Sequence, residues 1–159
     1  MLEPRLVLTG GLCITEFMAS NGQTLTDSFE DSSDWIELYN NGTSPINLSQ
    51  YYLTDDAAEL DKFALPDVNL AVGESVIVFA SNRDLVTPGG EIHTNFSLSA
   101  NGEYLALTDT NETIVQDFGA AYPPQIQDIS YGIEMFSGSP STLLAASSTV
   151  PMLIPDASN

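Results

Sequence analysis

The sequence has 159 residues, of which 43% are hydrophobic and 16% charged. This balance excludes a disordered chain, because such chains combine low hydrophobicity with high charge. Its 22 acidic residues stand against Arg5, Lys62 and Arg83, giving a formal net charge of -19. Nucleic acids and anionic membranes are therefore excluded as expected partners, since both need clustered cations.

The counts of cysteine and histidine limit the chemistry further. Cys13 is the only cysteine and His93 the only histidine, so no intrachain disulfide and no zinc site with paired Cys or His ligands can form. No apolar run reaches the roughly 18 residues of a membrane-spanning helix, so we expect no direct membrane insertion. An acidic surface stays soluble in salt, which favours an extracellular or cell-surface protein whose export signal lies outside this sequence.

Short runs rich in Val, Ile, Tyr and Phe alternate with clusters of Gly, Asn, Asp and Pro, a rhythm typical of an all-β fold. The predicted strands are residues 12–18, 35–39, 51–54, 75–80, 104–108 and 113–118. Residues 54–63 are expected to form a loop or a single helical turn, because the helical pattern covers only about two turns. Asn101 and Gly102 predict a tight hairpin turn.

Apolar and polar side chains alternate along these strands, so each strand has an apolar face and a polar face. We expect one core between two antiparallel sheets. Its predicted members are Ile14, Ile36, Leu38, Leu53, Val76, Val78, Leu105 and Leu107. Trp35 is interpreted as a packing residue rather than a ligand platform, and Cys13 as an inert buried thiol.

Five segments, in order, resemble the bacterial lamin tail domain family over residues 12–133. They are CITEFMASN at 13–21, DWIELYNNG at 34–42, INLSQYYLTDD at 46–56, KFALPDVNLAVGESVIVFAS at 62–81 and FSLSANGEYLALTD at 96–109. The resemblance implies an all-β, immunoglobulin-like antiparallel β-sandwich of the lamin-tail type. It also implies that Tyr51 fills the sandwich while Tyr52 faces outward.

The two ends of the sequence suggest a domain division. Residues 2–10, LEPRLVLTG, resemble the LEPR-XLL segment of large exported bacterial proteins, with Val7 departing from the usual pair of leucines. Residues 1–11 are thus expected to be a leader-like segment, and 12–136 the sandwich. Residues 137–159, rich in Ser, Pro and Ala, are expected to be a linker towards a further domain.

One acidic run is the best local candidate for a metal site. TDSFEDSSDW places Asp27, Glu30, Asp31 and Asp34 within eight residues, and Ca²⁺ prefers six to eight oxygen ligands. The run lacks the pattern of an EF-hand, so a solvated loop is the alternative interpretation. A second, weaker cluster comprises Asp55, Asp56, Glu59 and Asp61. We expect no cofactor other than this candidate Ca²⁺.

Catalytic motifs are absent from the sequence. A serine or cysteine triad would need His93 as its base, yet no nucleophile-elbow motif accompanies it. Glycoside hydrolysis would need a pair of carboxylates facing the substrate, and the sequence gives no reason to prefer one pair among the many acidic residues. We therefore expect no enzyme, and a non-catalytic structural or interaction module that binds an unknown protein or extracellular polymer. The alternative is a Ca²⁺-assisted adhesion or carbohydrate-binding module, and a hydrolase is a third class.

Overall fold

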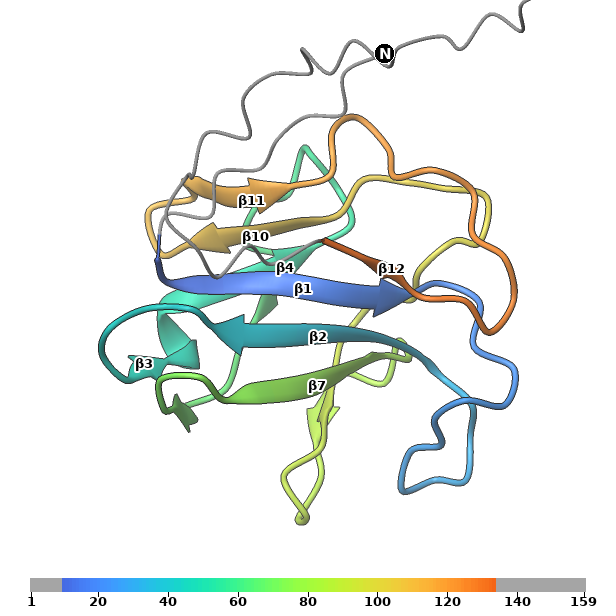
Figure 1. Cartoon of the computed structure of the whole chain (residues 1–159), viewed down its shortest axis with the longest axis horizontal. Helices are drawn as coiled ribbons and strands as arrows, with labels where there is room; N and C mark the ends of the chain where they lie inside the picture. Colours follow the sequence, from blue (N-terminus) through green and yellow to red (C-terminus); the bar gives the residue numbers. More distant parts are fainter. Residues whose placement is uncertain (1–9, 134–159) are drawn as a thin grey trace, which may run out of the picture.

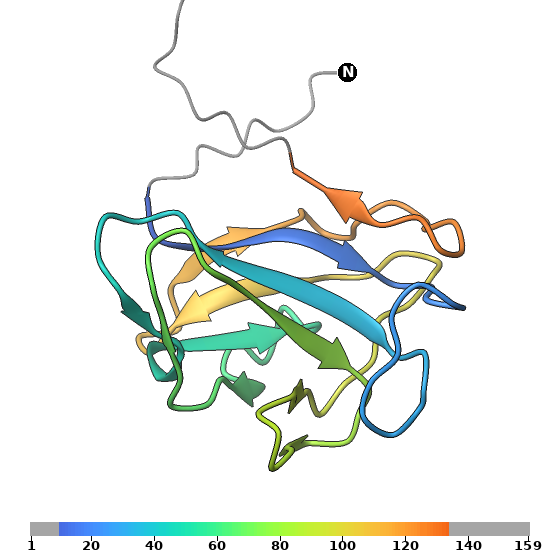
Figure 2. The same cartoon turned by 60° about the horizontal axis from the view of Figure 1, so that its bottom comes forward.

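The computed structural model describes residues 10–133, which form an all-β domain. The two larger sheets lie face to face as layers, with β1, β2 and β7 in the nearer layer of Figure 2 and β4, β10 and β11 behind. The strands are β1 (Leu12–Met18), β2 (Asp34–Asn40), β3 (Ile46–Asn47), β4 (Tyr51–Thr54), β5 (Phe63–Ala64), β6 (Asn69–Leu70), β7 (Ser75–Ala80), β8 (Leu85–Val86), β9 (Ile92–His93), β10 (Ala106–Asp109), β11 (Ile114–Asp117) and β12 (Tyr131–Gly132).

The six-stranded sheet has the order β12-β1-β2-β7-β9-β8, and the four-stranded sheet the order β11-β10-β4-β5 (Figure 1). β3 and β6 form a separate pair. All pairings are antiparallel except that of β7 with β9. The predicted antiparallel sandwich is thereby confirmed. Within residues 10–133, no helix has the length and apolarity to cross a bilayer.

One hydrophobic core fills the space between the two layers. Of the eight residues predicted for it, seven are fully buried and Val76 packs against them while half-buried. Tyr51 also packs against this core, as the family resemblance implies. Burying one such Leu or Ile side chain contributes about 1.5–3 kcal/mol, so this cluster is the main source of the domain's stability.

Gln116 of β11 joins the two sheets across the core edge. Its amide nitrogen donates to the carbonyl of Ile14 in β1 at 2.8 Å, and its amide oxygen accepts from the Ile14 N–H at 2.7 Å. Only 3% of Gln116 is exposed. The register of β1 against β2 shifts between Ile14 and Glu16. The side-chain amide thus provides Ile14 with the pair of hydrogen bonds that a neighbouring strand would supply.

Of the predicted span 54–63, residues 55–62 form a loop between β4 and β5, and a loop was one of the two structures predicted. The Thr54 hydroxyl donates to the carbonyls of Asp56 and Glu59 at 2.9 and 2.7 Å and holds the loop closed. The helix of the described part is a single 3-10 turn, η1 (Leu48–Gln50), which no pattern in the sequence predicted. The leader-like residues 1–9 and the predicted linker at 137–159 lie outside the described residues.

The predicted hairpin at Asn101 and Gly102 is wrong, although the turn itself exists. The Gly102 N–H donates to Ser99 at 3.1 Å, and Gly102 has a φ of +91° that favours glycine. The segments before and after the turn do not pair with each other. Residues 122–125 take their place: the Tyr122 N–H donates to Glu103 at 2.9 Å, and the Gln125 N–H donates to Ala100 at 2.7 Å.

Candidate functional site

Asp27 organises the loop between β1 and β2 that carries the acidic run. Its Oδ1 accepts from the N–H groups of Phe29 and Asp31 at 2.9 and 3.1 Å, and its Oδ2 from the Ser33 hydroxyl at 2.8 Å. Burial raises the pKa of Asp27, but these hydrogen bonds outweigh burial and hold it below its usual value. The side chain is 5% exposed, so it stabilises the loop from inside.

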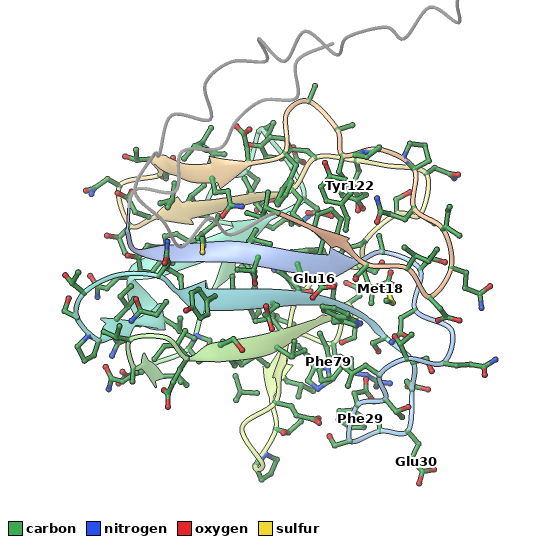
Figure 3. All side chains as sticks on the ribbon, viewed as in Figure 1. Glu16, Met18, Phe29, Glu30, Phe79 and Tyr122 are labelled. Atoms are coloured by element: carbon green, nitrogen blue, oxygen red, sulfur yellow. The ribbon has the colours of Figure 1, made fainter. Side chains whose placement is uncertain are left out.

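The other three predicted calcium ligands have separate surroundings. Glu30 is exposed, has a φ of 66° and points away from the molecule at the tip of the loop (Figure 3). Asp31 forms an ion pair with Arg83. Asp34 begins β2 and accepts the Asn21 N–H at 3.0 Å, and burial raises its pKa. The Ca²⁺ site at Asp27, Glu30, Asp31 and Asp34 stays a prediction.

Clusters of potential metal ligands were sought over the whole described part of the chain. Among residues 10–133, no three His, Cys, Asp or Glu side chains lie close enough together to hold a metal ion. In the second acidic cluster, Asp55 pairs with Lys62 at 2.6 Å, and Asp56 accepts the Ala58 N–H at 2.8 Å. These carboxylates are engaged in ion pairing and in shaping the turn.

His93 is the last residue of β9. Its ring has no exposed surface. It stacks on Phe79 with ring centroids 5.3 Å apart and meets the edge of Phe29 at 5.4 Å. Its Nδ1 lies 2.9 Å from the Ser81 hydroxyl, and its Nε2 lies 3.5 Å from Oε2 of Glu91. A polar ring is therefore enclosed between two aromatic side chains.

Arg83 connects the acidic loop to the segment between β7 and β8. Its guanidinium lies 4.3 Å from the centre of the Phe29 ring and pairs with Asp31. The flanking residues Asn82 and Asp84 have positive φ values of 57° and 53°, a conformation that Asn and Asp tolerate better than most residues. The aromatic contact and the ion pair together fix the loop against this segment.

Three apolar side chains remain exposed around these contacts. Phe29 is 44% exposed, Leu85 36% and Val86 47%. Leu85 and Val86 form β8, the edge strand of the six-stranded sheet, and Leu85 lies opposite His93. The β1–β2 loop and the β8–β9 hairpin extend on the β7 side of the molecule in Figure 1. Phe29, Arg83, Leu85 and Val86 are together called the loop–hairpin surface.

The acidic loop is evident in the sequence, whereas the loop–hairpin surface is not. Phe29 stood within the acidic run, where a large aromatic residue among carboxylates was the available signal. Leu85 and Val86 form a strand of two residues, too short for an alternating pattern to develop. Their position beside the loop depends on the parallel pairing of β7 with β9, which local sequence does not encode.

Cys13 is buried, as predicted, and its thiol contacts the carbonyl of Tyr39 at 3.5 Å. Burial, with a contribution from the negative charge of Glu37, raises the pKa of Cys13 to about 11. The thiol therefore stays protonated at neutral pH and is a poor nucleophile.

Comparison with known proteins gives one family. A family model described as Lamin Tail Domain matches residues 8–121, a span that includes every strand from β1 to β11. No curated protein matches the chain.

Proposed function

Because the chain belongs to the lamin tail domain family, whose fold is an immunoglobulin-like sandwich, we propose that it is a non-catalytic interaction module of a larger exported or cell-surface protein. The observation that carries the proposal is the loop–hairpin surface. It combines exposed apolar side chains with a fixed geometry, and a fixed geometry lowers the entropy cost of binding a partner.

The edge position of β8 supports contact at this surface. An edge strand has backbone N–H and C=O groups without a strand partner on one side, and such edges pair readily with extended segments of other chains. Phe29 and Arg83 lie next to this edge, and both residue types are enriched in protein interfaces. The proposed partner is a protein or an extracellular polymer.

A hydrolytic role for Ser81, His93 and Glu91 is the competing interpretation of the same residues. A triad histidine must take a proton from the serine and pass it to the leaving group, which requires a ring edge open to the substrate. The His93 ring has no exposed surface, and its Nε2 is 3.5 Å from Glu91. The arrangement favours a buried structural histidine over a catalytic base.

Site-specific photo-cross-linking in the full-length protein tests the contact surface. A benzophenone amino acid replaces Phe29 or Leu85, and the matched controls replace Val72 and Ile126, which are 50% and 68% exposed elsewhere on the domain. We expect cross-linked products from Phe29 and Leu85 in the producing cells, and few from the controls. Equal yields at all four positions would contradict a contact at the loop–hairpin surface.

A turnover assay tests the non-catalytic part of the proposal. Ester, phosphate and glycoside reporters are incubated with the purified chain and with Ser81→Ala. We expect no turnover above the buffer rate for either protein. Turnover that Ser81→Ala abolishes would replace the interaction module with a hydrolase.

A further inference from the structure

His93 Nε2 is a buried polar atom with unused hydrogen-bonding capacity. Among the described residues, four buried side-chain polar atoms have no hydrogen-bond partner, and His93 Nε2 is one of them. A buried polar atom without a partner is uncommon and costs free energy. Histidine is also the side chain that ordinarily gains or loses a proton between about pH 5 and pH 8. A proton added to the ring would make both of its nitrogens donors and give it a positive charge.

The nearest acceptor to this nitrogen belongs to Glu91, which also contacts the acidic loop. Oε2 of Glu91 lies 3.5 Å from His93 Nε2 and accepts the N–H of Ser28 at 3.0 Å. One carboxylate oxygen thus stands between β9 and the β1–β2 loop. The other ring nitrogen, Nδ1, is already 2.9 Å from the Ser81 hydroxyl. A ring protonated on both nitrogens would donate to Ser81 and to Glu91 at once.

The charges around the ring have both signs. The negative groups are Glu91 beside Nε2, Asp27 inside the loop, Asp31 at the ion pair and Asp84 next to β8. The positive group is Arg83, on the ring of Phe29. Hydrogen bonds from Ser28 to Glu91 lower the pKa of that carboxyl below its usual value, so Glu91 stays ionised while a histidine titrates.

We propose that His93 is a proton-operated clasp between β9 and residues 27–33. When solvent supplies a proton, Nε2–H donates to Glu91, which keeps its bond from Ser28, and the loop is held more tightly against β9. Phe79, stacked on the ring, favours the charged form through its π face. When the proton leaves, the ring loses its charge, its contact with Glu91 weakens, and the loop opens more often. The clasp rests on the proposed function only for its biological role, which is to change the geometry of the loop–hairpin surface that contacts the partner.

The chain allows this clasp to be observed directly, because His93 is its only histidine. The ring protons of His93 are followed by NMR between about pH 8 and pH 5, and hydrogen exchange of residues 28–33 is measured over the same range and corrected for intrinsic exchange. We expect exchange protection in the loop to rise about threefold or more as the ring takes up its proton. Both changes should share one midpoint.

Two variants separate the clasp from general effects of pH. In Glu91→Gln the ring should still titrate, but the rise in loop protection should fall to less than half, because the charged acceptor is gone. In His93→Gln the loop should show no pH-dependent change over the same range. Loop protection that stays flat in the wild-type chain, or that rises equally in either variant, would overturn the proposal.

The outcome does not depend on the partner. Exchange protection is a property of the isolated domain, whereas photo-cross-linking from Phe29 and Leu85 reports a contact with another molecule. A working clasp with no cross-links would contradict the contact surface alone. Cross-links with flat loop protection would contradict the clasp alone.

Discussion

Trp35 packs on the outer face of the six-stranded sheet, away from the core between the sheets. It lies opposite Met18 on one side and Phe79 on the other, and these three buried residues form a second apolar cluster. Figure 3 shows Met18 and Phe79 at the same end of the sheet. Trp35 is 9% exposed, and its Nε1 has no hydrogen-bond partner within the described residues. Its role is therefore apolar packing.

Truncation of this ring should be costly, and a smaller aromatic should be tolerated. Trp35→Ala should lower the free energy of unfolding by about 3–5 kcal/mol. Trp35→Phe should cost less than about 1.5 kcal/mol, because it keeps a ring and removes an unpaired N–H. Urea denaturation measures both, with the exposed Ile126→Ala as control. Equal costs for the two Trp35 variants would assign an essential role to the indole N–H.

Asp27 should make folding stability depend on pH in a defined direction. Its pKa in the folded chain lies below the unfolded value of 3.8. Its stabilising contribution is therefore present above pH 3.8 and is lost as the pH falls through the folded value. Asp34, whose pKa is raised, contributes with the opposite sign.

The comparison of Asp27→Asn with the wild-type chain isolates this contribution. At pH 7 the variant should be less stable by about 1–3 kcal/mol, because an amide cannot accept at both positions that the carboxylate oxygens serve. The difference should shrink as the pH falls below 4. Urea unfolding from pH 7 to pH 3 measures it, and a difference that grows towards low pH would reverse the assigned sign.

At the scale of elements, Gln116 takes the place of a missing strand-to-strand ladder between β1 and β11. β12 pairs with β1 only at Glu16 and Phe17. Further along β1, the Gln116 amide satisfies both backbone groups of Ile14. One side chain therefore stabilises the contact between two sheets that share no backbone pairing at that point.

Gln116→Leu should leave the Ile14 N–H and C=O unpaired inside the protein. Each unsatisfied buried group costs about 1–3 kcal/mol, so we expect a loss of about 2–6 kcal/mol for the two groups. Gln23→Leu makes the same chemical change at an exposed position and should stay within about 0.5 kcal/mol of the wild type. Gln116→Glu adds a diagnostic test: its protonated acid can both donate and accept, so its stability should partly recover on acidification. Lack of any penalty in Gln116→Leu would rule out this role.

For the whole molecule, charge is the dominant feature beyond the fold. In the described part of the chain, Lys62 and Arg83 are the only Lys and Arg, and both form ion pairs with carboxylates. The remaining negative charges repel one another. Monovalent salt should therefore raise the melting temperature by screening over about 10 Å at 0.1 M.

Calcium at matched ionic strength distinguishes a specific site from screening. Because the oxygens of Asp27 accept loop hydrogen bonds and Asp31 pairs with Arg83, we expect equal melting temperatures in sodium, magnesium and calcium salts. A real Ca²⁺ site would instead raise the melting temperature by mass action. Magnesium would act more weakly, because it dehydrates reluctantly. A rise specific to calcium that disappears in Asp31→Asn with Asp34→Asn would establish the site and favour the Ca²⁺-assisted alternative.

The sequence by itself determined the all-β class, the core-facing residues of β2, β7 and β10, and the family. These properties are local: period-2 patterning sets which side of a strand is apolar, and each apolar side needs a second sheet to cover it. Ile36, Leu38 and Val78 could be assigned to the core on that basis alone, and all three have no exposed surface.

Only the tertiary structure decided which distant groups meet. Gln116 and Ile14 are 102 residues apart, and Ser28 reaches Glu91 across 63 residues. The enclosure of His93 depends on a parallel pairing between β7 and β9. The hairpin predicted at Asn101 failed for the same reason, since residues 122–125 occupy its backbone partners. Contacts of this kind follow from how the sheets stack and which edges remain open, and no local pattern of side chains specifies them.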